Sequence, residues 1–241
     1  MKLFRFGHVL LAAILAAPAA SAQKVDYDHQ EAWKAMHDSA QSPIDIESAR
    51  AKPADALEQQ GIRLLRMRSA LEAVDNGHAV EVEVKGPEAV IRGRHFVMQQ
   101  FHFHVESEHT LNGKHAPLEG HFVFKATDGR LAVIAVMYRE GATNALASKL
   151  LEAIGKGSKA ELPATDISTL LPNSRAYYHY LGSLTTPPLT ENVEWYVLKD
   201  PVALSSAQLD EFRRHYPHNN RQIQPLNDRP VTAYPGPRKS S

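Results

Sequence analysis

The chain has 241 residues, a length that fits one large β-rich domain or two small ones. Lysine and arginine together number 27, as do aspartate and glutamate, so the formal net charge is zero and we expect no nucleic-acid partner. The chain contains no cysteine, so it can form no disulfide, and any zinc site must be built from histidine and carboxylate side chains.

The N-terminal segment has the features of a cleaved export signal. Two basic residues precede an apolar run, Val9 to Ala17, that is too short to span a bilayer, and Ala20-Ser21-Ala22 has the small residues of a cleavage site. Residues 1–22 therefore predict a signal peptide, and residues 23–241 a single domain that is periplasmic or secreted. We expect no membrane span in the mature chain.

Short strands are predicted in the first half of the mature chain. After one helical turn near residues 31–36, Gln41 to Ile46 is expected to be extended, because a residue before proline is pushed toward the β region. Asn76-Gly77 and Gly86-Pro87 are typical of turns. The segments around these turns predict four strands, at 61–67, 71–75, 78–84 and 88–92.

Two alternating segments carry three histidines. The first, Gln100-Phe-His-Phe-His104, places His102 and His104 on one face of a predicted strand, since residues i and i+2 point the same way. The second, Glu119 to Phe124, places His121 on the same face as Glu119. If the strands lie side by side, three imidazoles converge. Three nitrogen ligands suit Zn²⁺ and leave its fourth position open, which is typical of a catalytic site.

Gln100 and Glu119 each lie two residues from one of these histidines, on the same predicted face. A metal-bound imidazole usually donates its second N–H to a carboxylate, carbonyl or amide, so both side chains are candidates to hold a ligand in place. The alternative is a set of partly exposed strand histidines without metal. The third histidine, with an acidic residue two positions before it, favours the metal site.

The second half of the chain completes a predicted sheet. Leu131 to Tyr138 is apolar on both faces and is predicted to be a central strand. Two helices are predicted, at 144–154 with Gly155 as its cap and from a capping box at 205–208 to about 215. Further strands are predicted at 177–180 and 193–198, with a rigid turn between them, and the tail after Ala233 is expected to fray.

Several of these segments together resemble the alpha-class carbonic anhydrases, in particular the exported bacterial type, across nearly the whole mature chain. The matching blocks are Gln41-Ser-Pro-Ile-Asp-Ile46, Gln100 to His104 with Ser107-Glu-His-Thr110, Glu119-Gly-His121, and Tyr177 to Pro188. The resemblance implies a mainly β fold with a few short helices. Its centre is a large, twisted, mostly antiparallel sheet of about ten strands, with zinc at the base of a conical cleft.

The resemblance also implies an activity, the zinc-dependent, reversible hydration of CO₂ to bicarbonate and a proton. Zinc-bound hydroxide attacks CO₂, and a histidine then passes the proton to solvent. The partners are these small molecules, and a homodimer is left open. The implied zinc ligands are His102, His104 and His121, with Gln100 and Glu119 as their supporting partners.

The remaining implied roles follow the same match. Thr185 accepts a hydrogen bond from zinc-bound hydroxide, Glu108 orients Thr185, and His78 is the proton shuttle. The substrate-binding residues are Val123, Val133 and Leu184, which form an apolar wall for CO₂, and Thr186, which contacts bicarbonate. Asn76 and Tyr27 are expected around the site, Tyr27 in its water network.

The chain departs from the family pattern at two positions that bear on the site. Leu189 stands where many exported members have a disulfide-forming cysteine, and Glu81 stands where a neutral amide is common. A non-catalytic zinc-binding or zinc-storage protein on the same fold is the alternative function. Such a protein would need neither Thr185 nor Glu108.

Overall fold

The computed structural model describes residues 25–237, apart from residues 76, 77, 156 and 158. The predicted signal peptide and the candidate residue Asn76 therefore lie outside the described residues.

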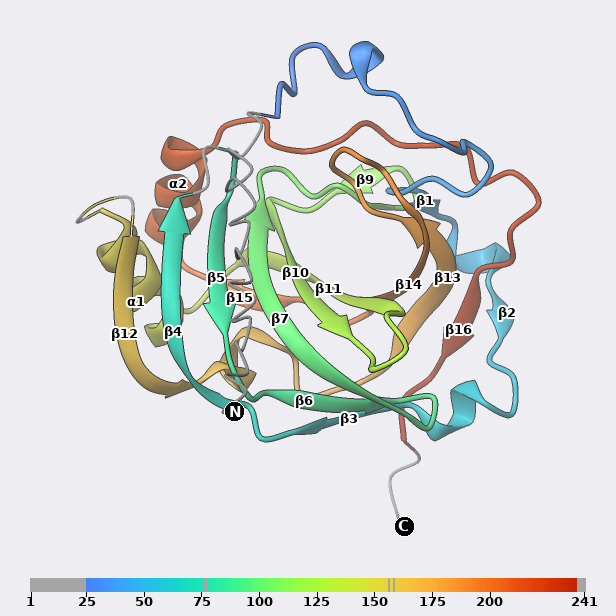
Figure 1. The fold of residues 1–241 in the computed structure, drawn as a ribbon, viewed down its shortest axis with the longest axis horizontal. Coiled ribbons are helices and arrows are strands. Elements are labelled where there is room, and N and C mark those ends of the chain that lie inside the picture. The colour runs from blue at the N-terminus through green and yellow to red at the C-terminus, as the bar shows by residue number, and fades with distance from the viewer. Residues whose placement is uncertain (1–24, 76–77, 156, 158, 238–241) are drawn as a thin grey trace, which may run out of the picture.

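A sheet of 13 strands dominates the described part of the chain (Figure 1). Its main path runs through β12 (Lys159–Asp166), β4 (Arg68–Asp75), β5 (Val80–Val84), β7 (Arg94–His104), β10 (Leu118–Lys125), β11 (Leu131–Glu140), β14 (Glu191–Leu198), β13 (Tyr177–Ser183), β16 (Thr232–Tyr234) and β2 (Lys52–Pro53). Off this path, β15 (Val202–Leu204) pairs with β11, and β6 (Glu88–Ile91) joins β3 (Ile62–Leu65) to β7. A separate small sheet contains β1 (Asp45–Ile46), β8 (Thr110–Leu111) and β9 (Lys114–His115).

The large sheet is mostly antiparallel, as predicted, with three parallel pairs of strands. The β11–β14, β11–β15 and β16–β2 pairs are parallel, whereas the remaining pairs of the large sheet are antiparallel. Parallel neighbours need a long connection, and the chain between β11 and β14 supplies one that contains α1 (Ala145–Ile154), β12 and β13. The prediction that 131–138 forms a central strand is confirmed, since β11 is buried on both faces along most of its length.

Several strands were not predicted, and β12 and β16 are two of them whose sequences carry weak signals. The alternating polar residues of β12 include Pro163, which favours an edge strand at most, and β12 indeed lies at one end of the sheet. The tail was expected to fray after Ala233, yet Tyr234 belongs to β16, is buried, and packs its ring 5.0 Å from that of Tyr177.

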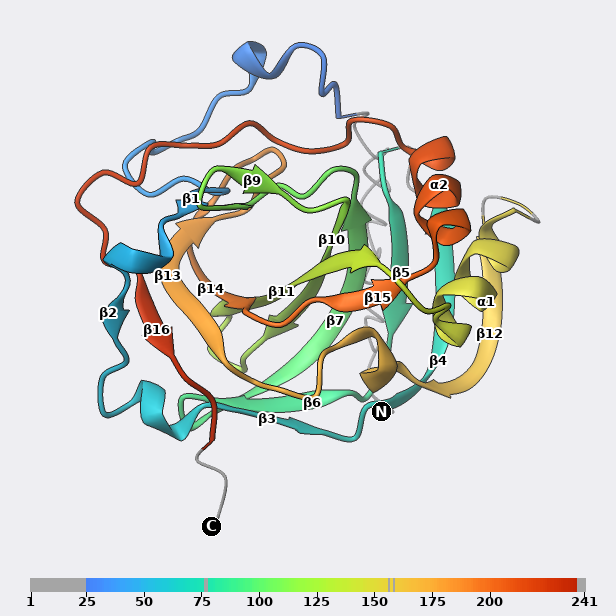
Figure 2. The same cartoon turned by 180° about the vertical axis from the view of Figure 1, so that it is seen from behind.

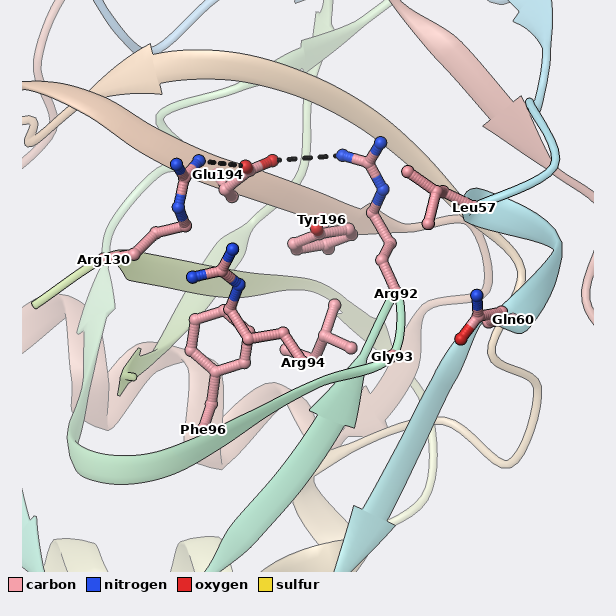
Figure 3. A pocket seen from close by; sticks show the side chains of 10 residues that line it. Leu57, Gln60, Arg92, Gly93, Arg94, Phe96, Arg130, Glu194 and Tyr196 are labelled. Atoms are coloured by element: carbon pink, nitrogen blue, oxygen red, sulfur yellow. Dashed lines mark hydrogen bonds and ion pairs between the residues drawn. The ribbon is translucent and has the colours of Figure 1, made fainter. Parts of the chain in front are cut away.

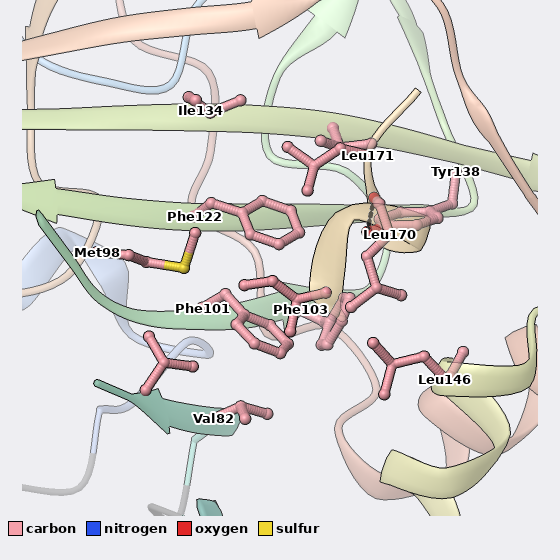
Figure 4. Close-up of a cluster of buried hydrophobic side chains, with 14 of the residues drawn as sticks. Val82, Met98, Phe101, Phe103, Phe122, Ile134, Tyr138, Leu146, Leu170 and Leu171 are labelled. Atoms are coloured by element: carbon pink, nitrogen blue, oxygen red, sulfur yellow. Dashed lines mark hydrogen bonds between the residues drawn. The ribbon is translucent and has the colours of Figure 1, made fainter. Parts of the chain in front are cut away.

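The apolar face of β7 and β10 forms the main core (Figure 4). Phe101 and Phe122 lie on adjacent strands with their rings stacked 5.2 Å apart, and Phe103 packs 4.7 Å from Phe212 of α2 (Ser206–His215). The period-two alternation that buries these phenylalanines turns the histidines between them to the opposite face. The core therefore fixes the direction in which the candidate ligands point.

The two α-helices lie side by side near the β12 and β4 edge of the sheet (Figures 1 and 2). Asn144 caps α1 by accepting hydrogen bonds from two backbone amides, and Ser205 and Gln208 form the predicted capping box of α2. Short 3₁₀ helices occur at η1 (Gln30–Ala32), η2 (Ser48–Arg50), η3 (Glu58–Gln60) and η4 (Ile167–Leu170). Within the described residues, no helix has the length and apolar character needed to cross a membrane.

Candidate zinc site and catalytic residues

The pairing of β7 with β10 brings the three candidate zinc ligands together. The strands run antiparallel with His102 directly opposite His121, and His104 follows two residues after His102 on the same face. The imidazole centroids are 4.9 Å apart for His102 and His104, 5.2 Å for His102 and His121, and 4.5 Å for His104 and His121. One ligand nitrogen from each lies within 4.8 Å of the other two, close enough to share a metal ion.

Each imidazole of this group is oriented by a different acceptor. Gln100 Oε1 accepts from His102 Nδ1 at 2.8 Å, and Glu119 Oε1 accepts from His121 Nε2 at 2.9 Å. The backbone carbonyl of Asn219 accepts from His104 Nδ1 at 2.6 Å. These bonds fix which nitrogen carries the proton, so His102 Nε2, His104 Nε2 and His121 Nδ1 keep their lone pairs.

The chemistry of this donor set fits Zn²⁺. His104 Nε2 is buried and has no hydrogen-bond partner among the described residues, as expected of an atom whose partner is a metal ion. Burial lowers the pKa of both His102 and His104, and the positive charges of neighbouring histidines lower that of His102 further, so these imidazoles are neutral at pH 7. Neutral imidazole is the form that binds metal.

Glu119 holds a second buried histidine, His109, which the sequence analysis gave no role. Glu119 Oε1 also accepts from His109 Nδ1 at 2.7 Å, and His109 Nε2 lies 2.6 Å from the hydroxyl of Tyr180. Burial alone would raise the pKa of Glu119, but the charges and hydrogen bonds of His109 and His121 lower it well below its usual value. Glu119 therefore stays ionised and fixes the ring of His121.

Asn219, which also had no predicted role, connects this group to the candidate shuttle. Its side-chain amide donates to the carbonyl oxygens of Phe103 and His78, at 2.9 and 3.1 Å, and its Oδ1 accepts from the amide of Val105 at 2.7 Å. One buried side chain thus connects the end of β7 to His78, which precedes β5, while its own carbonyl holds His104.

Replacing Asn219 by alanine is expected to lower the free energy of unfolding by at least about 2 kcal/mol, since each buried polar group left unpaired costs about 1–3 kcal/mol. The backbone carbonyl remains, so zinc should still bind, but less tightly because the end of β7 is less firmly held. Urea denaturation and chelator competition measure the two effects. Asn173→Ala changes an exposed asparagine with an ordinary backbone conformation and serves as the control. An equal, small effect in both variants would contradict the role of Asn219.

Glu108 is fully buried beside the histidines. Its Oε1 accepts from the backbone amide of Arg221 at 2.7 Å, and its Oε2 lies 3.9 Å from His121 Nδ1. Oε2 has no hydrogen-bond partner among the described residues, and the bond to Thr185 implied by the resemblance is not formed in this structure. The orienting role of Glu108 therefore stays a prediction. Thr185 itself is buried, in the turn after β13.

The three candidate wall residues share one hydrophobic cluster with Trp195. Val123 lies opposite Val133 in the β10–β11 pair, and Val133 lies opposite Trp195 in the β11–β14 pair. The side chains of Val123, Val133 and Trp195 therefore point to the face that carries His121. Leu184 packs against the same cluster, and the ring of Trp195 lies 4.8 Å from that of His121. An apolar surface thus adjoins the histidines. Thr186 is half-buried in the turn beyond Leu184.

His78 and Tyr27 line one pocket of about 510 Å³ near the histidines. The charge of His78 contributes to the lowered pKa of His102, after burial and the charges of His104 and His121. Burial and then the negative charge of Glu108 raise the pKa of Tyr27. Both residues therefore lie within electrostatic reach of the site, from segments far apart in the chain.

Glu81 also belongs to this face of the sheet. It lies directly opposite His102 in the antiparallel β5–β7 pair, and paired residues of adjacent strands project their side chains to the same side. Glu81, which replaces the neutral amide common in the family, therefore places a carboxylate next to the candidate ligand His102. It lies on β5, the strand that follows His78.

Comparisons with known proteins agree with this geometry. The family model of eukaryotic-type carbonic anhydrase matches residues 27–235. The chain is 43% identical over 194 residues to a carbonic anhydrase of Pectobacterium atrosepticum, covering 78% of each chain, and 39% identical over 198 residues to one of Klebsiella pneumoniae, covering 79% of this chain and 78% of the relative.

Solved structures show the same likeness. An alpha-carbonic anhydrase of Thermovibrio ammonificans, in complex with the inhibitor sulfanilamide, matches with a TM-score of 0.73 and 41% identity, over 80% of this chain and 87% of the other. Dioscorin complexed with ascorbate matches with a TM-score of 0.75 at 28% identity, over 83% and 87% of the two chains. Family model, relatives and fold agree, and the chain belongs to the eukaryotic-type carbonic anhydrase family.

Proposed function

We propose that this protein is a zinc-dependent carbonic anhydrase that interconverts CO₂ and bicarbonate. The observation that carries the proposal is the triad His102, His104 and His121. One ring nitrogen of each lies within 4.8 Å of the other two, and each imidazole donates to a separate acceptor. Three neutral ligands leave one coordination position for the reaction.

Zn²⁺ bound to the triad would lower the pKa of a coordinated water from about 15.7 to about 7 and so supply hydroxide at neutral pH. The chain positions the other reactant. CO₂ has no net dipole, so the surface formed by Val123, Val133 and Leu184 suits it better than hydrogen-bond donors would. Thr185 and Thr186, in the turn beyond Leu184, are the proposed polar contacts of the nucleophile and of bicarbonate.

A non-catalytic zinc-binding or storage protein on the same fold is not favoured. A storage site needs ligands but no apolar wall beside them, whereas here the ligand face continues directly into one. The buried carboxylate of Glu108, held by the amide of Arg221, would also have no purpose in storage. The site is arranged for a reaction next to the metal.

Stopped-flow CO₂ hydration on residues 23–241 tests the proposal. Zinc-loaded protein should hydrate CO₂ well above the buffer rate, a chelator should abolish this activity, and added zinc should restore it. Protein that holds one zinc per chain and yet gives only the buffer rate would refute catalysis and leave the binding function.

Export to the periplasm and a single domain over residues 23–241 are further parts of the proposal. The basic, apolar and small-residue pattern of residues 1–22 supports export, and the family match over 27–235 supports the single domain. N-terminal sequencing of the protein recovered from the periplasm tests the cleavage near Gln23. A homodimer stays a prediction, which sedimentation equilibrium can check.

His78→Ala is expected to lower kcat in weak buffer by about ten-fold, less than the usual effect of a positioned proton-transfer group, because buffer replaces part of its function. The value of kcat/KM for CO₂ should hardly change, since the proton leaves after the chemical step. Added imidazole should restore kcat.

His29→Ala is the matched control, because His29 lines the same pocket but is exposed. If His29→Ala lowers kcat and His78→Ala does not, the shuttle assignment is wrong. The proposed Asn76 contact lies outside the described residues and is tested in the same assay by Asn76→Ala.

A further inference from the structure

A second pocket lies at the opposite end of β7 from the candidate zinc ligands. It has a volume of about 540 Å³ and is formed by the β6–β7 turn, η3, β14 and the turn between β10 and β11 (Figure 3). Arg94, the first residue of β7, lies eight residues before His102, which is roughly 26 Å along an extended strand. The pocket is therefore separate from the reaction site.

Three guanidinium groups surround this pocket. Figure 3 shows those of Arg92, Arg94 and Arg130 around the ring of Tyr196. Of the described residues that line the pocket, Glu194 alone is acidic. The lining thus carries three positive charges against one negative charge, although the chain as a whole is neutral.

The carboxylate of Glu194 already contacts three neighbouring side chains. Its Oε1 accepts from Arg130 Nη1 at 2.8 Å, and its Oε2 accepts from Arg92 Nη1 at 3.4 Å and lies 2.7 Å from His179 Nε2. The other nitrogen of His179 lies 2.5 Å from Glu58 Oε1. Burial alone would raise the pKa of Glu194, but His179, Arg130 and Arg92 lower it to about 2, so it stays ionised and holds two of the guanidinium groups in place.

The two exposed carboxylates that pair with these arginines are only weak competitors for a ligand. Arg94 pairs with Asp128, and Arg92 Nη2 lies 3.6 Å from Asp55, but both carboxylates are more than half exposed, at 52% and 58%. Exposed ion pairs contribute little stability because water screens them. A ligand can take their place at small cost, and a planar guanidinium forms paired hydrogen bonds with carboxylate or phosphate oxygens.

The size and floor of the pocket favour an organic ligand over a bare inorganic ion. Leu57 supplies exposed apolar surface, Phe96, Ile91 and Tyr196 form a floor that is almost completely buried, and Gln60 adds a neutral amide. Gly93 has φ +78°, and a Cβ there would meet Gln60 Oε1 at 2.5 Å, so glycine lets the amide sit against the turn. The volume falls in the range of small-molecule sites, which is about 300–1,000 Å³.

We propose that this pocket binds a small organic polyanion, a metabolite with two or more carboxylate or phosphate groups, through Arg92, Arg94 and Arg130. The apolar floor contacts the carbon skeleton, and Gln60 contacts a hydroxyl or an anionic oxygen. Because the pocket contains none of the candidate zinc ligands or catalytic residues, binding there does not depend on the hydration reaction.

Isothermal titration of the zinc-loaded protein at constant ionic strength tests this site. The probes are tricarballylate and fructose 1,6-bisphosphate, which separate a carboxylate from a phosphate ligand, with acetate and fructose as controls. At least one polyanion should bind, and the controls should not. Lack of binding by both polyanions would overturn the proposal.

Variants then locate the bound ligand. Arg94→Gln leaves the Glu194 contacts intact and should weaken binding about ten-fold, the cost of one charge-assisted hydrogen bond, and Arg94→Gln/Arg130→Gln should weaken it further. Arg213→Gln is the matched control, because Arg213 is similarly exposed and also pairs with one aspartate. CO₂ hydration should be unchanged in every variant. Affinity that persists unaltered in the double variant would place the ligand elsewhere, for instance at the zinc site, and refute the proposal.

Discussion

Replacing His104 by alanine is expected to remove stoichiometric zinc and CO₂ hydration together. The Nδ1 of His104 is held by the carbonyl of Asn219, and its buried Nε2 has no hydrogen-bond partner among the described residues, which leaves this atom free to bind the metal. Two remaining imidazoles cannot retain the metal against dilution, since three protein ligands are the usual minimum of a catalytic zinc site. Elemental analysis after dialysis and stopped-flow hydration measure both losses.

The control for this variant lies on the same strand. His95→Ala changes a half-exposed histidine near the start of β7, which bonds to Glu88 and lies far from the triad, so zinc content and turnover should match the wild type. Thermal melting of zinc-free protein shows whether His104→Ala still folds. Full zinc occupancy in a folded His104→Ala protein would mean that the ligands lie elsewhere.

The triad could be predicted from the sequence because its geometry is local. A spacing of two residues within a strand fixes the shared face of His102 and His104, and the alternation with Phe101 and Phe103 decides which face is buried in the core. Only the pairing of β7 with β10 had to be assumed, and a polar connection with turn residues made these strands natural neighbours.

The supporting residues could not be found in the same way. Asn219 is 115 residues from His104 in the chain and lies in an irregular segment after α2, where nothing in the local sequence predicts a position beside the site. His109 follows Glu108 in a recognised motif, but its bond to Glu119 depends on how the segment between β7 and β8 folds back. Side-chain contacts of this kind require the tertiary structure.

The pocket lined by Arg92, Arg94 and Arg130 could not be predicted from the sequence either. Arg92 and Arg94 are close in sequence, but Arg130 comes from the turn between β10 and β11. Glu194 comes from β14, which the parallel β11–β14 pair brings alongside. Both strands are predicted from their sequences, but their parallel pairing is not. The strand order thus creates a charged site that no single segment reveals.

Thr185→Val is expected to leave zinc bound while turnover falls by roughly 10²-fold, the effect of losing one oriented hydrogen bond at a reacting centre. Valine has nearly the shape of threonine, so the buried turn after β13 should keep its packing. The lost hydroxyl can no longer accept a hydrogen bond from the nucleophile. Thr190→Val, at an exposed position of the same turn, is the control and should retain full activity.

A double-mutant cycle then tests whether Glu108 acts through Thr185. The structure places Glu108 beside His121 without a bond to Thr185, so the two residues act either as a pair in the loaded enzyme or independently. If Glu108 orients the threonine hydroxyl, Glu108→Gln should lower kcat by itself but cause little further loss in the Thr185→Val background, because residues that act as a unit are not additive. Zinc content and the free energy of unfolding should be measured for all four proteins, since Glu108 also accepts from the Arg221 amide. Fully additive losses in kcat would assign Glu108 a separate role at the ligands.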